Sequence, residues 1–292
     1  MYLQKAERKK AKMRLSIQGP SGSGKTYSSL LVAHGLCGDY SKVCIIDTEN
    51  HSGELYSHLG DYNTIQLAAP YSPEKFIQAI QLCQTEGVEV IIIDSSSHEW
   101  DGIGGILDIH AAIPGNSFTA WSKVTPRHNA FIQAMLTSSC HIITTIRSKQ
   151  EYVLSEKNGK QMPEKVGMKG IQRDGYEYEA TLSFELFRNH SAQVSKDRTG
   201  LFEGKYDIVL NEEVGKLIKD WCNEGSRPSV DFVQNRIGDC TSIQELLEIY
   251  KSFPEFRAVL KPEFEKRKRQ ILLGQEVQTQ LANEKIHFNG VH

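Results

Sequence analysis

Short apolar runs alternate with longer segments of helical periodicity over the first half of the chain. The apolar runs occupy residues 13–18, 42–47, 88–94 and 141–147. Between the last two, residues 117–139 carry apolar side chains at the spacing of one amphipathic helix, which continues through Pro126. Strands that alternate with helices are typical of a parallel sheet covered by crossover helices. The pattern therefore predicts an α/β fold with a mostly parallel central sheet.

The pattern changes after residue 150. Charged, glycine-containing loops come first, and then two alternating runs at 179–187 and 191–196 flank a turn at 188–190. Alternation with a short polar turn predicts an antiparallel hairpin. We expect this hairpin to extend one edge of the parallel sheet.

A change in composition near residue 225 predicts a domain boundary. Residues 225–229 read GSRPS, which is typical of a linker. Beyond it, Ser242 and Glu245 have the spacing of a capping box that opens a helix, and a second helix is expected over 264–273. The predicted organisation is a core over 1–224, whose residues 1–12 form a basic extension, and a C-terminal helical hairpin and tail over 230–292.

A phosphate-binding loop lies between the first predicted strand and the first helix. The sequence GPSGSGKT matches the pattern G-x-x-x-x-G-K-[ST] in full. Glycines allow backbone N–H groups to converge on phosphates, Lys25 can bridge the β and γ phosphates, and Thr26 can ligate Mg²⁺. ATP and Mg²⁺ are therefore the expected cofactors. The residues expected to contact the nucleotide are Gly19, Pro20, Ser21, Gly22, Ser23, Gly24, Lys25, Thr26 and Tyr27.

Carboxylates at strand ends supply the remaining candidates for the chemistry. Asp94 ends the run 88–94, where open α/β sheets bind their ligands, and is expected to hold Mg²⁺ together with Thr26. ATP hydrolysis also needs a group that orients or deprotonates water. Glu49, directly after the strand at 42–47, is favoured for this role, and Glu99, in the loop after Asp94, is the alternative.

These motifs, taken in order, resemble those of the RecA-core ATPases. The segments SKVCIIDTENHSGELYSHLG, VEVIIIDS and HIITTIRSK are similar to the RecA segments that bear the catalytic glutamate, the metal-directed aspartate and the strand entering a DNA-binding loop. The segment VSKDRTGLF resembles an element through which one subunit reaches its neighbour's γ-phosphate. The strongest resemblance, over residues 12 to about 205, is to phage RecA-like ATPases of single-strand annealing and recombination.

The resemblance implies further roles. Lys196 and Arg198 would act in trans on a neighbouring subunit, which requires a homo-oligomer such as a ring or short filament. Where RecA has a glutamine that senses the γ-phosphate, this chain has Thr145, so Thr145 or Arg147 is expected to serve as the sensor. Single-stranded DNA is the expected partner, and a single-strand-binding protein or helicase is a further one.

Two segments are predicted to contact DNA. Residues 147–173 hold seven Lys and Arg against three Glu, and residues 98–105 are expected to expose Trp100 among glycines. Basic groups can follow phosphates and aromatic rings can stack on bases, although a solvated charged loop and simple packing of Trp100 are the alternatives. The candidate DNA contacts are Trp100, Lys149, Tyr152, Lys157, Lys160, Lys165, Lys169 and Arg173.

The charge distribution agrees with a narrow binding path. The chain has 34 Lys and Arg against 36 Asp and Glu, a net charge of −2, which argues against a uniformly basic surface for duplex DNA. Residues 5–14 carry a net +5 and residues 147–173 a net +4, so the rest of the chain carries −11. Positive charge is therefore concentrated in two segments.

The sequence thus predicts a DNA-stimulated ATPase that acts on single-stranded DNA in phage recombination, annealing or replication. A nucleotide-dependent loader that recruits a helicase or single-strand-binding protein is one alternative, and a small-molecule kinase is another. The six cysteines form no closely spaced pair, the N-terminus lacks a secretory apolar segment, and no run is long enough to span a bilayer. A cytoplasmic protein encoded by a phage or prophage, without a membrane partner, is expected.

Overall fold

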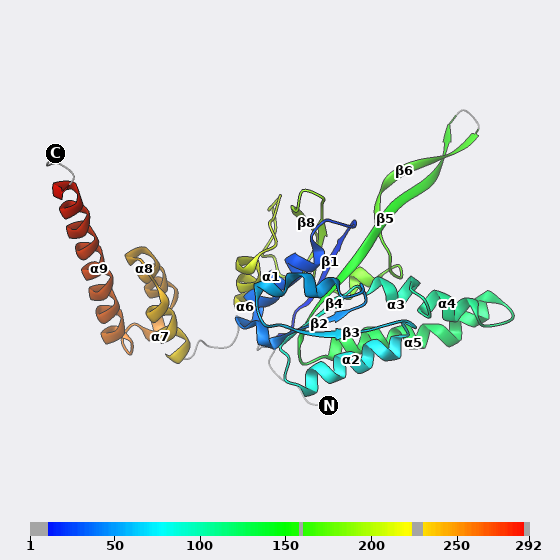
Figure 1. The fold of residues 1–292 in the computed structure, drawn as a ribbon, viewed down its shortest axis with the longest axis horizontal. Helices are drawn as coiled ribbons and strands as arrows, with labels where there is room; N and C mark the ends of the chain where they lie inside the picture. Colours follow the sequence, from blue (N-terminus) through cyan, green and yellow to red (C-terminus); the bar gives the residue numbers. More distant parts are fainter. Residues whose placement is uncertain (1–10, 158–159, 224–229, 289–292) are drawn as a thin grey trace. The chain divides into compact units, whose positions relative to one another are not determined.

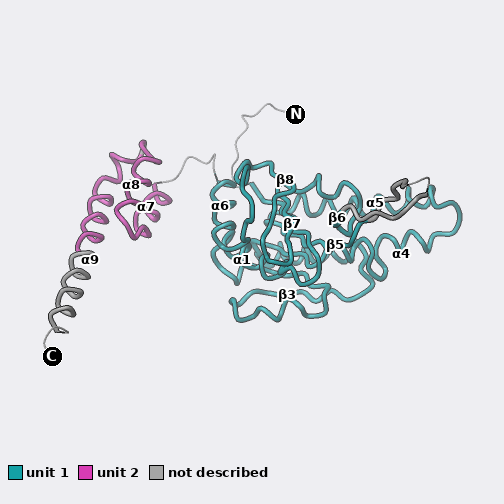
Figure 2. The backbone as a smooth tube through the Cα atoms, turned by 90° about the horizontal axis from the view of Figure 1, so that it is seen from above, with its two compact units in different colours: residues 1–225 teal, residues 226–292 magenta. Residues whose placement is uncertain are grey.

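The computed structural model describes residues 11–157, 160–223 and 230–288, with side chains in these ranges except at 152–157, 160–166, 255 and 275–288. Most of the predicted basic extension and the linker at 225–229 lie outside the described residues. The chain divides into two compact units, residues 1–225 and residues 226–292 (Figure 2). No helix in the described ranges is long and apolar enough to cross a membrane.

An eight-stranded sheet forms the centre of the first unit, in the order β3-β2-β4-β5-β1-β7-β8, with β6 paired to β5 (Figure 1). The strands are β1 (Arg14–Gly19), β2 (Val43–Asp47), β3 (Asn63–Gln66), β4 (Val90–Asp94), β5 (His141–Lys157), β6 (Lys160–Gly170), β7 (Leu182–Leu186) and β8 (Ala192–Asp197). All neighbours are parallel except β7 with β8 and β5 with β6. The predicted α/β class and the antiparallel edge hairpin are confirmed.

Helices pack on both faces of the sheet. The helices of this unit are α1 (Lys25–Cys37), α2 (Pro73–Thr85), α3 (Ser97–Asp101), α4 (Ile106–Ala111), α5 (Ser117–Thr137) and α6 (Glu212–Asn223), and those that cover the sheet are α1 and α6 on one face and α2 and α5 on the other. Because successive strand residues point to opposite faces, Ile45 packs in a core with α1 and α6, whereas Ile46 packs in a second core with α2 and α5. Helix α5 contains Pro126, as the sequence predicts. The sheet is therefore held between two apolar layers.

One expectation for the strands of this unit was wrong, and one strand was missed. Much of the segment 147–173, expected as loops, forms β-strands, in which Ser148 pairs with Gly170 and Lys157 with Lys160. These strands extend beyond the parallel sheet (Figure 1) and carry polar residues at successive positions, so they lack the apolar alternation that marks a half-buried strand. Strand β3 was missed for the same reason, because its four residues, NTIQ, lie at the sheet edge and none is buried.

The second unit has three helices in its described part, α7 (Val230–Asp239), α8 (Ile243–Ser252) and α9 (Lys261–Phe288), where two were predicted. They share a small core that includes Val233, Leu246 and Phe264. Helix α7 buries only Val233 and Ile237, which is a weak periodic signal. The predicted capping box between Ser242 and Glu245 is confirmed.

Candidate nucleotide-binding site

The phosphate loop joins the carboxyl end of β1 to the start of α1. Gly22 and Gly24 have φ angles of 78° and 90°, a left-handed conformation that glycine adopts without a steric penalty. A Cβ atom on Gly19 would lie 2.5 Å from the backbone oxygen of Leu186. The loop therefore requires glycine at these positions, and it ends at a helix N-terminus, which is suited to binding phosphate.

The polar groups of this loop fit a nucleotide triphosphate. Ser23 is fully buried, and its Oγ has no hydrogen-bond partner among the described residues. Lys25 Nζ donates to the carbonyl oxygen of Pro20 at 3.0 Å. Burial lowers the pKa of Lys25, although the nearby charges of Asp94 and Glu49 oppose this shift. These groups would hold the β and γ phosphates.

Asp94 and Thr26 meet beside this loop, as a magnesium site requires. Thr26 Oγ1 donates to Asp94 Oδ2 at 2.6 Å, and Thr145 Oγ1 donates to Asp94 Oδ1 at 2.5 Å. Asp94 is only 2% exposed, and burial raises its pKa against the effect of these two hydrogen bonds. A hydroxyl and a carboxylate are hard oxygen ligands of the kind that Mg²⁺ prefers. The donor set therefore fits Mg²⁺.

Glu49 lies in the same site as Asp94 and the phosphate loop. Its carboxylate accepts hydrogen bonds from Ser95 Oγ at 3.1 Å and from Arg147 Nε at 2.6 Å, and Arg147 Nη2 pairs with its second oxygen. Burial opposes the charge of Glu49, but the hydrogen bond and positive charge of Arg147 outweigh it, so the pKa of Glu49 lies below its ordinary value. An ionised carboxylate is therefore present beside the phosphate loop.

Glu99 occupies a different environment. Its side chain is 0% exposed, and both carboxylate oxygens lie 3.1 Å from Nδ1 of His128, whose side chain is 3% exposed. Burial raises the pKa of Glu99, against the hydrogen bond and charge of His128. Glu99 therefore joins α3 to α5, and the described contacts favour Glu49 over Glu99 as the group that acts on water.

The sensor candidates Thr145 and Arg147 both reach this site. They are alternate residues of β5, so their side chains share one face of that strand. Thr145 contacts Asp94 and Arg147 contacts Glu49. Sequence reasoning missed Ser95 and also His190, whose Nδ1 lies 3.0 Å from the carbonyl oxygen of Ser23. Ser95 directly follows a strand end, and that position was the available signal.

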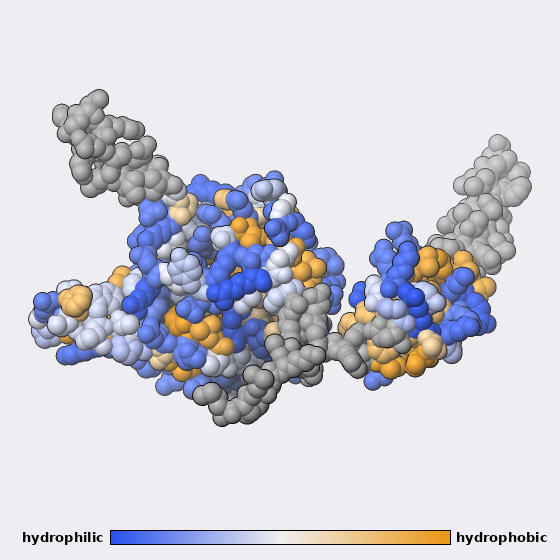
Figure 3. All heavy atoms as spheres, turned by 180° about the vertical axis from the view of Figure 1, so that it is seen from behind, coloured by the Kyte–Doolittle hydropathy of each residue, from blue (hydrophilic) through white to orange (hydrophobic). Residues whose placement is uncertain are grey.

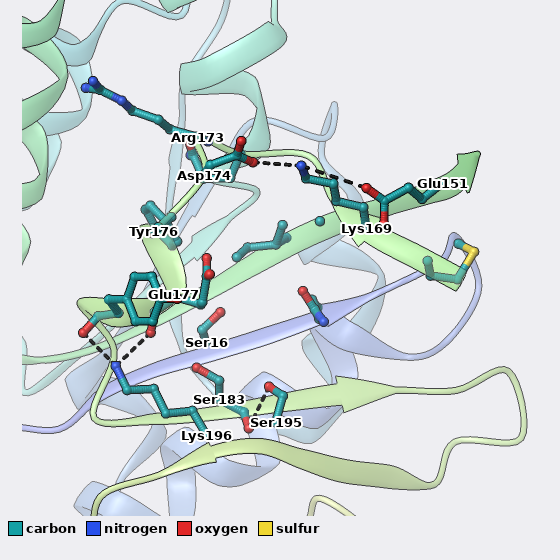
Figure 4. Close-up of a pocket in the computed structure, with 17 residues that line it drawn as sticks. Ser16, Glu151, Lys169, Arg173, Asp174, Tyr176, Glu177, Ser183, Ser195 and Lys196 are labelled. Atoms are coloured by element: carbon teal, nitrogen blue, oxygen red, sulfur yellow. Dashed lines mark hydrogen bonds and ion pairs between the residues drawn. The ribbon is translucent and has the colours of Figure 1, made fainter. Parts of the chain in front are cut away.

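Lys196 and Arg198 lie apart from the phosphate loop of their own chain. Lys196 pairs with Ser183, which pairs in turn with Ser16, three residues before the end of β1. Lys196 Nζ donates to the carbonyl oxygens of Glu177 and Tyr178 at 2.9 and 2.6 Å (Figure 4), and Arg198 Nη2 donates to Tyr178. Their action on a neighbouring subunit stays a prediction.

Four of the DNA-contact candidates come together in one pocket, namely Trp100, Lys149, Lys169 and Arg173. Trp100 is not an exposed loop residue, because Ser97–Asp101 is helix α3 and the indole is partly buried. The side chains of Tyr152, Lys157, Lys160 and Lys165 lie outside the described residues. Contact of any of these residues with DNA stays a prediction.

The comparisons with known proteins place the chain in a family. A search of curated proteins found no match. The model of the AAA domain family, a family of P-loop nucleoside triphosphatases that generally use ATP and Mg²⁺, matches residues 11–199. That range includes the phosphate loop, Glu49, Asp94 and β5, and it covers more than half of the chain. The chain therefore belongs to the AAA domain family, and its phosphate loop is that of a P-loop ATPase.

Proposed function

We propose that this protein is a RecA-like ATPase whose hydrolysis of ATP is stimulated by single-stranded DNA, in phage recombination, annealing or replication. The observation that carries this proposal is the double contact of β5 with the ATP site. Thr145 contacts the metal-site carboxylate Asp94, and Arg147 contacts Glu49. The same strand continues into the hairpin that contains most of the segment rich in Lys and Arg.

The side chains of the ATP site have separate roles in hydrolysis. Lys25 and the loop N–H groups bind and orient the triphosphate, and Thr26 with Asp94 would hold Mg²⁺, which neutralises charge on the phosphates. Glu49 orients the attacking water and accepts its proton. Because Arg147 holds both oxygens of Glu49, the carboxylate must leave this pair, at least in part, to act on water.

The second strand of the hairpin is linked to the same site. The backbone N–H and Oγ of Ser96 donate to the carbonyl oxygen of Thr145 at 3.0 and 3.1 Å. Gln172, just after β6, donates from Nε2 to the carbonyl oxygen of Ser96 at 3.0 Å. DNA bound along β5 and β6 therefore has a direct route by which to shift Arg147 and Thr145 relative to Glu49 and Asp94.

We also propose that Lys196 and Arg198 complete the site of a neighbouring subunit in a ring or short filament. Their position away from the phosphate loop of their own chain supports a role in trans. Cations that reach the γ-phosphate stabilise the charge that develops during transfer. Hydrolysis would then depend on assembly as well as on DNA.

The test is the rate of ATP hydrolysis with no DNA, with single-stranded DNA and with duplex DNA, at two salt concentrations. Single-stranded DNA is expected to raise turnover several-fold, and the stimulation is expected to weaken at the higher salt because phosphate contacts release counterions. ATP turnover that no DNA changes would refute the DNA-stimulated role, while leaving the ATPase assignment in place.

A loader that recruits a helicase or single-strand-binding protein is a second candidate, and the C-terminal unit supports it. This unit has its own hydrophobic core and also exposes apolar side chains such as Leu247, at 52%, and Leu273, at 60%. Figure 3 shows hydrophobic residues on the surface of this unit. Removal of residues 226–292 is expected to abolish partner binding and retain DNA-stimulated turnover if the unit serves recruitment.

A further inference from the structure

A pocket of about 580 Å³ lies between the base of the β5–β6 hairpin and helices α3, α4 and α5. Its apolar lining includes two indoles, Trp100 from α3 and Trp121 from α5, together with Leu107 from α4. Trp121 is not among the residues predicted to contact DNA, and 20 residues of sequence lie between it and Trp100. The fold alone brings the two rings into one pocket.

The two indoles are members of a stack of rings. Trp100 and Trp121 have centroids 5.9 Å apart and planes inclined by 18°. His110 stacks on Trp121 at 4.1 Å, and His128 meets Trp100 edge-on at 5.5 Å. Both indoles are partly exposed. The neighbouring rings therefore hold the two indoles in a fixed orientation, and a planar ligand can stack on them.

The buried pair of Glu99 and His128 fixes this arrangement. Glu99 immediately precedes Trp100, and His128 lies two turns beyond Trp121 on α5, so the pair ties the two indole-bearing helices together. A buried carboxylate needs such a partner, since burial without one is costly. The pair thus limits the motion of both rings before any ligand arrives, which lowers the entropy lost on binding.

Cationic groups line the same pocket. Lys149 and Arg173 reach it from the two ends of the hairpin segment. Arg173 extends away from Asp174 and Lys169 in Figure 4, and its Nη2 lies 3.5 Å from Thr125 Oγ1 of α5. Lys169, by contrast, is paired with Asp174 at 2.7 Å. Lys149 and Arg173 are therefore the cations best placed to contact the phosphates of a ligand that enters this pocket. The lining also contains two carboxylates, those of Asp101 and Asp174.

We propose that this pocket binds an unpaired nucleobase of single-stranded DNA, stacked on Trp100 and Trp121, with Lys149 and Arg173 on the adjoining phosphates. The proposal rests on the proposed function, because it takes DNA as the ligand and adds the place where a base is held. A base in a duplex already stacks on both sides and cannot enter. The pocket therefore accepts single strands and excludes duplex DNA. Through this contact, bound DNA positions the residues where the β5–β6 hairpin leaves the sheet.

The experiment compares two probes of equal charge, an oligothymidylate of about 12 nucleotides and an abasic phosphodiester of the same length. The wild-type protein is expected to bind oligothymidylate at least roughly tenfold more tightly, because stacking on an aromatic ring contributes that much per base. Trp121→Ala and Trp100→Ala are expected to reduce this preference to near one while leaving affinity for the abasic strand unchanged.

Two control positions, Phe118 and Lys123, lie on α5, the helix that carries Trp121. Phe118 of α5 is 85% exposed and does not line the pocket, so Phe118→Ala is expected to change neither affinity. Lys149→Ala is expected to weaken both probes by the same factor, since it removes a phosphate contact. Lys123→Ala, an exposed lysine of α5 outside the pocket lining, controls for loss of one positive charge.

A fluorescence measurement removes dependence on the alanine variants. Trp221→Phe leaves Trp100 and Trp121 as the only tryptophans, since the chain has three. Oligothymidylate, and not the abasic strand, is expected to quench their emission. Trp121→Phe keeps a stacking ring and is expected to retain most of the preference for bases.

The outcomes separate the two proposals. Equal wild-type affinity for the two probes, with no quenching, overturns the nucleobase site and leaves a DNA-stimulated ATPase standing. Absence of binding to every oligonucleotide overturns both. Unaltered preference in folded Trp100→Ala and Trp121→Ala proteins would place the base elsewhere and would also overturn the inference.

Discussion

Replacement of Glu49 by glutamine is expected to separate ATP binding from ATP hydrolysis. Glutamine has nearly the volume of glutamate and keeps one oxygen that can accept from Ser95 Oγ and Arg147 Nε, which contact Glu49 at 3.1 and 2.6 Å. What it loses is the negative charge and the capacity to accept a proton from water. The phosphate loop and the Thr26–Asp94 contact lie outside the substitution, so ATP affinity is expected to remain within about threefold of wild type.

The expected magnitudes follow from the same geometry. The side chains of Arg147 and Glu49 are 46% and 20% exposed, so loss of their charge attraction is expected to cost about 1 kcal/mol of stability or less. Loss of a general base lowers turnover by at least about a hundredfold, which corresponds to about 2.7 kcal/mol of barrier. Steady-state phosphate release measures the second effect, and thermal unfolding measures the first.

Glu99→Gln is the matched control. It makes the same chemical change in a carboxylate that is 0% exposed and paired with His128. Disruption of a buried pair is expected to cost more stability, roughly 1–5 kcal/mol, while turnover per folded molecule, measured without DNA, stays within a few-fold of wild type. A hundredfold loss of turnover in Glu99→Gln, together with near-normal turnover in Glu49→Gln, would refute the assignment and transfer the catalytic role to Glu99.

Four further results are expected. Lys25→Ala abolishes turnover and weakens ATP binding in a nucleotide-binding assay, and retained turnover would contradict the phosphate-loop assignment. A mixture of Lys25→Ala and Arg198→Ala subunits regains part of the lost turnover if Arg198 acts in trans, whereas no recovery indicates action within one chain. Arg147→Gln reduces the ratio of turnover with and without single-stranded DNA to near one, and an unchanged ratio would exclude Arg147 as the link. The hydrogen bond from Arg127 lowers the pKa of Glu74 to about 2. The contribution of this pair to folding stability, about 1 kcal/mol, is therefore complete above pH 4.5 and lost as the pH falls toward 2. Glu74→Gln is expected to lose less thermal stability than wild type over that range, and equal pH profiles would contradict this.

Local sequence patterns predicted those strands and loops whose structure is indicated by their own residues, without reference to a partner segment. The run VIIID is buried at every position, so apolar residues alone mark it as a central strand. The phosphate loop needs glycine at Gly22 and Gly24 because of their backbone angles, and that requirement is visible in the sequence. Strand β6 had no such signal, because its pairing with β5 depends on the partner strand and not on apolar alternation.

The sequence by itself determined the family of the fold, the phosphate loop and the candidates Glu49 and Asp94, since each follows from residues adjacent along the chain. The sequence favoured Glu49 over Glu99 as the group that acts on water, and only the tertiary structure showed their surroundings: parallel pairing of β2 with β4 brings two strand ends together, whereas Glu99 on α3 contacts His128. Only the tertiary structure brought Trp121 beside Trp100. Contacts between distant segments depend on strand register and helix packing, which no local pattern encodes.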